Sequence, residues 1–146
     1  MTAVLQVSDN QRIIPTADQV LNQLMYAIAR ELGLGKRQAE QAANARSLRL
    51  DGIQVSVSCL ETDLHRDAII VAKLPLTLDP DSTRQLLEIN LIAAIALHAT
   101  IAIDSDGGAI LLAMLPVEET TAVVFAKHIS QMVLFALTVQ QQIGEK

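Results

Sequence analysis

The chain has 146 residues, a length that suits one domain able to bury a sizeable core. Only 2% of its residues are aromatic and its formal net charge is -5, which argues against base stacking and against binding to a phosphate backbone, so no nucleic-acid partner is expected. Cys59 is the single cysteine, which excludes an internal disulfide and favours a reducing compartment. Because neither a signal peptide nor a membrane-spanning run is visible, we expect a soluble, cytoplasmic protein.

The predicted elements begin after an arm, residues 1–15, that shows no sustained periodicity. A helix is predicted over residues 16–32, because Thr16 or Asp18 can cap it and apolar residues follow at helical spacing. The Ala- and Gln-rich stretch 36–47 gives a weak helical signal and is interpreted as a connector. Two strands with period-two alternation are predicted next, over 47–50 and 53–60, and the turn Asp51-Gly52 connects them.

The second half of the chain adds further strands and helices. Residues 61–67 are predicted to be a polar turn, and 68–76 a third strand that ends at Pro75. A helix over 82–99 precedes a hairpin of two strands that closes at Pro116, and the last helix covers 118–142. The fold class is therefore α+β, with the order helix, three strands, helix, two strands, helix. We expect an antiparallel twisted sheet packed by helices in one domain, 16–146.

The helix predicted over 82–99 is apolar on more than one face. Two apolar sets share it: Leu87, Leu91, Ala94 and Ile95 at spacings of three and four, with Ile89, Ile92, Ala93 and Ala96 beside them. One face can cover the chain's own sheet, but a second apolar face needs another partner. A second copy is the commonest partner of a small soluble protein, so we expect a homodimer.

No titratable cluster matches a recognised metal site. The separations of His65, His98 and His128 fit no compact zinc motif, so solvated or hydrogen-bonded histidines are favoured. Asp104-x-Asp106-Gly107 begins like a calcium loop but lacks the later oxygen ligands, which favours a hairpin turn. We expect no metal and no cofactor.

Catalysis is also disfavoured. Ser56, Ser58 and Cys59 lie on a predicted strand without a base that could activate a nucleophile. The carboxylates of residues 61–67 could form an acid and base pair, but such charges are normal in an exposed turn. We therefore expect that the protein is not an enzyme.

The order of elements and three local motifs resemble the class I chaperones of bacterial type III secretion, the Tir-chaperone-like family. The motifs are Leu86-Leu87-Glu88-Ile89-Asn90-Leu91, then Asp104-Ser105-Asp106-Gly107 with the strand 109–112, and Leu115-Pro116 before the last helix. These motifs specify a fold rather than a catalytic site. Two features depart from the family: the arm before Pro15 is longer than usual, and the last helix lacks the aromatic residue that often ends it.

The resemblance implies a cytoplasmic bacterial homodimer that binds the extended N-terminal segment of a secreted effector and keeps it soluble and export-competent, a virulence function. The secretion ATPase is a further candidate partner. Strand addition at a sheet edge, with apolar side chains in hydrophobic patches, would supply the affinity. The implied dimer interface is Leu87, Leu91, Ile92, Ala94, Ile95, Ile101 and Ile103, and the implied effector-binding residues are Leu21, Leu24, Ile28, Leu48, Leu50 and Val55.

The alternative is a regulator or adaptor of the same fold that binds a folded protein of the secretion or transcription machinery. A co-purified partner separates the two hypotheses. A protected peptide favours the chaperone, whereas a globular partner favours the adaptor.

Overall fold

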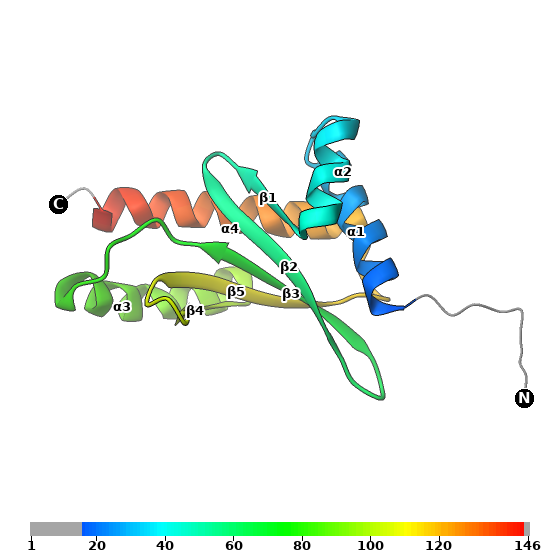
Figure 1. Ribbon diagram of the computed structural model, residues 1–146. Coiled ribbons are helices and arrows are strands. Elements are labelled where there is room, and N and C mark those ends of the chain that lie inside the picture. Colours follow the sequence, from blue (N-terminus) through cyan, green and yellow to red (C-terminus); the bar gives the residue numbers. More distant parts are fainter. Residues whose placement is uncertain (1–15, 145–146) are drawn as a thin grey trace, which may run out of the picture.

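The computed structural model describes residues 16–144, so the predicted arm, residues 1–15, lies outside the described residues. Its elements confirm the α+β order, with one helix more than expected (Figure 1). In chain order they are α1 (Ala17–Glu31), α2 (Lys36–Ala45), β1 (Ser47–Leu50), β2 (Ile53–Glu61), β3 (Arg66–Lys73), α3 (Pro80–Leu97), β4 (Ala99–Ile103), β5 (Ala109–Pro116) and α4 (Ala122–Gly144).

Helix α2 corrects the prediction of a connector over 36–47. Its buried face consists of Ala39, Ala42 and Ala43, which pack against α1. The side-chain amide of Asn22 on α1 also donates to the carbonyl of Ala43 at 3.3 Å. Alanine is a strong helix former but only weakly hydrophobic, and the rest of this helix is polar. Its inner face therefore does not stand out as an apolar stripe in the sequence, although the alanines recur at helical spacing.

Several element boundaries differ from the prediction for local reasons. Helix α3 begins at Pro80 rather than 82, because the carboxylate of Asp79 accepts the N–H of Ser82 at 2.8 Å and proline suits the first helical position. Helix α4 begins at Ala122 rather than 118, where the hydroxyl of Thr121 accepts the N–H of Val124 at 3.2 Å. Strand β3 runs from Arg66 to Lys73, so the predicted turn is shorter than 61–67.

The five strands form one antiparallel sheet in the order β1-β2-β3-β5-β4. The register aligns Val55, Ala72, Leu111 and Ile101 across four strands, and this row faces the core. The opposite face carries Val71 next to Leu112 and Ile69 next to Met114, none of which belongs to the core. Helix α4 therefore packs against one face of the sheet, behind it in Figure 1, whereas α2 lies beside the sheet against α1 and β1.

Helix α4 is the central core helix. Phe125, Ile129, Met132 and Val139 on its inner face are almost completely buried. Judged by length and composition alone, the stretch Ala122–Ile143 of this helix could cross a membrane. In the folded protein, 39% of its 18-residue apolar window is buried. Since its buried side chains pack against the sheet and α1, its apolar character is that of a core helix.

Candidate functional site

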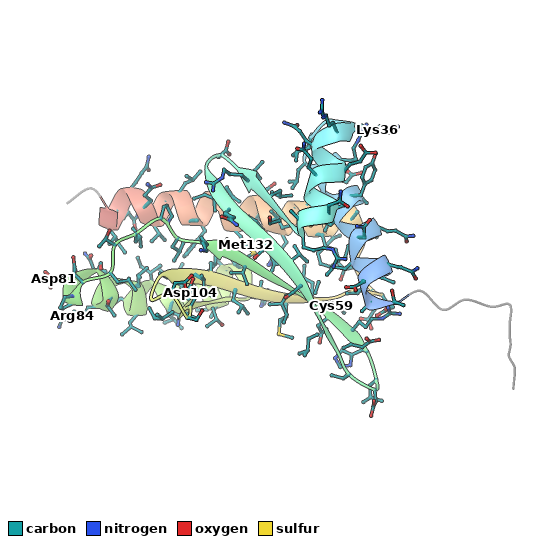
Figure 2. The ribbon with its side chains drawn as sticks, in the orientation of Figure 1. Lys36, Cys59, Asp81, Arg84, Asp104 and Met132 are labelled. Atoms are coloured by element: carbon teal, nitrogen blue, oxygen red, sulfur yellow. The ribbon has the colours of Figure 1, made fainter. Side chains whose placement is uncertain are left out.

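The residues considered for chemistry have structural roles. Asp104, labelled in Figure 2, lies in the hairpin between β4 and β5, where its carboxylate accepts the N–H groups of Asp106 at 2.9 Å and Gly108 at 3.0 Å. No group of three or more His, Cys, Asp and Glu side chains that could hold a metal occurs within residues 16–144. The antiparallel pairing of β4 with β5 on either side of this turn confirms the hairpin interpretation of Asp104-x-Asp106-Gly107.

Contacts between polar and charged side chains hold the turn between β2 and β3. His65 lies 3.0 Å from Asp67, and Arg66 lies 3.0 Å from Glu118. Burial raises the pKa of the neighbouring Cys59 thiol, and the negative charge of Glu61 raises it further. The thiol is thus kept protonated at neutral pH, the opposite of what an activated nucleophile needs.

The most distinctive surface is an apolar stripe on α3. Leu87, Leu91, Ile92 and Ile95 are 69%, 66%, 56% and 71% exposed, and Ala94 is exposed among them. The same helix buries Leu86, Ala93 and Leu97 against the protomer. The helix is therefore apolar on two sides, and only the narrower side is covered by its own chain.

Helix α3 is fixed along the edge strand β4. The side-chain oxygen of Asn90 accepts the backbone N–H of Ile101 at 2.8 Å. Ile101 packs partly against the core, whereas Ile103 at the end of β4 is 54% exposed. Of the two strand residues predicted for the dimer interface, Ile103 thus has the larger free surface.

Four of the six residues predicted to bind an effector lie in the core. Leu21, Ile28, Leu48 and Val55 are buried, Ile28 and Val55 completely, so their side chains offer no surface to a partner. The periodicity that selected them marks the inward face of a helix or strand, and that face packs on the protomer's own sheet and helices. Leu24 and Leu50 are partly exposed and remain available for contact.

Leu50 lines a groove of about 470 Å³ between α4, the end of α1 and the β1–β2 turn. Leu32 at the end of α1 and Leu50 at the β1–β2 turn form its walls, and α4 forms its floor. The floor includes Val123 and Leu134, both more than half exposed. Neither residue was predicted as a site from the sequence. Both lie on the face of α4 opposite Phe125 and Met132, and apolar residues on that face are the signal of a second apolar surface.

Charged side chains surround this groove. Glu31 lies at the end of α1, Asp51 lies in the β1–β2 turn, and Lys127 lies on α4. Within residues 16–144 none of the three makes an ion pair. The groove thus combines an apolar floor with unpaired charges at its rim, which suits a partner segment that has apolar side chains next to charged ones.

Comparisons with known proteins identify the family of this chain and structures with a similar fold. Residues 23–139 match the sequence model of the Tir chaperone protein (CesT) family. No curated protein is significantly similar in sequence. The fold is similar to that of the Yersinia pestis type III secretion chaperone SycH, solved in complex with a stable fragment of YscM2, at 17% identity, 82% coverage of this chain, 98% coverage of that chain and a TM-score of 0.57.

A second solved structure, the HopA1-SchA chaperone–effector complex, is similar at 11% identity, with 88% of this chain and 99% of that chain covered and a TM-score of 0.64. At such identities the likeness establishes the fold, and the family match spans most of the chain. Both agree with the α+β fold described above. The chain is a member of the Tir chaperone protein (CesT) family.

Proposed function

We propose that the protein is a cytoplasmic, non-enzymatic chaperone of type III secretion. It acts as a homodimer, binds the extended N-terminal segment of a secreted effector, and keeps that segment soluble and competent for export. Family membership supports this function, and the two similar structures contain a chaperone with a bound protein partner. The single observation that carries the proposal is the pair of apolar surfaces, on α3 and over α4, that the protomer leaves uncovered.

The α3 stripe serves as the dimer interface. Leu87, Leu91, Ile92 and Ile95 lie on one helix face and are mostly exposed. Burying such side chains between two copies would contribute about 1 to 2 kcal/mol each. Ala94 provides a small residue that allows close approach, and Ile101 and Ile103 extend the interface along β4.

The groove over α4 receives the effector. Its volume of about 470 Å³ accommodates a few aliphatic side chains of an extended segment. Of the predicted effector-binding residues, Leu50 lines this groove, where Val123 and Leu134 add exposed apolar surface. Leu24 also has free surface but does not line the groove. Main-chain pairing at a sheet edge would supplement these apolar contacts.

Sedimentation velocity of the Leu91→Asp, Ile95→Asp double variant tests the dimer. Two charges on the stripe should convert the dimer into a folded monomer, because a buried unpaired carboxylate is strongly disfavoured. Leu64→Asp is the matched control, since Leu64 is 91% exposed at the β2–β3 turn, away from α3. A double variant that stays folded and dimeric would refute the assignment of this interface.

Effector binding is tested by co-expression with the first hundred or so residues of candidate effectors, followed by limited proteolysis. A chaperone protects one continuous peptide of the partner, and Leu134→Asp should abolish the protection without changing the dimer. If the protected partner is instead a globular protein of the secretion or transcription machinery, the adaptor hypothesis replaces this one. The secretion ATPase can be examined in the same assay.

A further inference from the structure

The sheet edge beside β1 is only partly covered. β1 pairs with Ile53–Ser56 of β2, and the carbonyl of Arg46 accepts the N–H of Val57 at 3.0 Å, but β2 continues to Glu61. Because backbone groups alternate sides along a strand, the N–H and C=O of Cys59 and Glu61 point to the same side as those of Val57. No backbone partner for these groups is found within residues 16–144. The outer part of β2 is an open strand edge.

This edge is also partly apolar. Leu60 is 46% exposed, and Cys59, labelled in Figure 2, is only partly covered by the core. Figure 1 shows the β2–β3 hairpin extending beyond the helices on this side. An uncovered, apolar strand edge invites pairing with another chain, and soluble proteins usually cover such an edge. We therefore expect another strand to pair with this edge of β2.

The first turn of α1 lies next to this edge. The guanidinium of Arg46, at the start of β1, donates to the backbone carbonyl of Asp18 at 3.1 Å and lies 3.7 Å from the Asp18 carboxylate. The same side chain donates to the carbonyl of Ala43 at 3.2 Å. Arg46 thus holds the first turn of α1 at the point where β1 stops covering β2.

The length and composition of the preceding segment suit the edge. Cys59 lies two residues beyond Val57, about 7 Å along the strand, and five extended residues span about 17 Å. Ile13 and Ile14 are β-branched and favour a strand. The side chain of Arg12 is opposite in charge to that of Glu61, which is exposed.

We propose that residues 10–14 add to the sheet as a strand beside Cys59–Glu61, in the place that a longer β1 would occupy. The occupant is this segment of the same chain, rather than a second copy or an effector. It covers the open edge of β2. This inference does not depend on the proposed chaperone function.

Disulfide trapping in the full-length protein tests the pairing, because Cys59 is the only native cysteine. Single cysteines replace each residue from 4 to 14 in turn, and diamide at low protein concentration oxidises the two thiols to a disulfide. Bridges to Cys59 should form at alternate positions within 10–14, at least about tenfold faster than at other arm positions or in urea. The same substitutions in a Cys59→Ser chain are the controls.

Uniform bridging along the arm, or no bridging, would overturn the proposal. Bridges between two chains only would show that a second copy occupies the edge, and would also overturn it. Hydrogen exchange gives an independent measurement: the amides of Cys59 and Glu61 should exchange at least about tenfold more slowly than the outward amides of Ser47 and Arg49. Ile13→Pro, which removes a backbone donor from the proposed strand, should abolish the difference, and equal rates in the unaltered protein would contradict the pairing.

Discussion

Helices α3 and α4 are both long and apolar, but they bury their apolar residues in different places. α4 places Phe125, Ile129 and Met132 in the protomer's core, whereas α3 buries mainly Leu86, Ala93 and Leu97 and leaves a wide aliphatic stripe in solvent. Hydropathy alone therefore does not tell a core helix from an interface helix. Substitutions should separate them, since α4 controls folding and α3 is proposed to control assembly.

The largest effect is expected on α4. Phe125→Ala removes a fully buried aromatic ring and should lower the free energy of unfolding by about 3 to 5 kcal/mol, because a cavity remains where the ring was. Urea denaturation followed by circular dichroism measures the loss. The neighbouring Val124, which is 50% exposed, provides the control Val124→Ala, for which little change is expected. Equal losses in both variants would mean that α4 is not the core helix.

A smaller effect is expected where α3 attaches to the sheet. Asn90→Ala removes the acceptor for the Ile101 N–H and should lower the free energy of unfolding by about 1 to 2 kcal/mol, since a part-buried donor loses its partner. Asn90→Asp keeps an oxygen acceptor and should restore most of the loss. If both variants are as stable as the unaltered protein in urea denaturation, the hydrogen bond does not hold α3 against β4.

Elements with a clear hydrophobic period could be predicted from the sequence, whereas the partner that covers each apolar face could not. Strands such as Ile53–Glu61 alternate clearly, and the α3 stripe is visible because Leu87, Leu91 and Ile95 recur at helical spacing. Helix α2 was missed because its buried face is only alanine. Periodicity identifies a face but does not identify what covers it, so Ile28 and Val55 were assigned to a binding surface although they lie in the core.

The groove over α4 depends on tertiary structure that no local pattern encodes. Its walls come from the end of α1 and the β1–β2 turn, and its floor comes from a helix far along the chain. Val123 and Leu134 lie on the outer side of that helix, where a sequence pattern cannot show that Leu32 and Leu50 stand beside them. The apolar stripe on α3 could be predicted because it belongs to one element, whereas the groove requires three elements.

The smallest effect concerns the contact between the two helices. His128 lies on α4, and its pKa is lowered from the ordinary value of 6.5, first by burial and then by the charge of His98 at the end of α3. The buried Nε2 of His128 has no hydrogen-bond partner within residues 16–144, so a proton there would not be stabilised. The unfolded chain binds this proton more readily than the folded one, so the stability contributed by His128 is complete well above pH 6.5 and falls as the pH drops through that value.

Urea denaturation at pH 7.5 and at pH 5.5, at one fixed protein concentration, measures this dependence above the range in which exposed carboxylates titrate. The loss of stability between the two pH values should be smaller in His128→Gln than in the unaltered protein. His65→Gln is the matched control, because His65 lies in the exposed β2–β3 turn and its replacement should leave the His128 contribution in place. An unchanged pH dependence in His128→Gln would show that the packing of α3 on α4 tolerates a charged histidine, and the two helices would then be less tightly coupled than their contact implies.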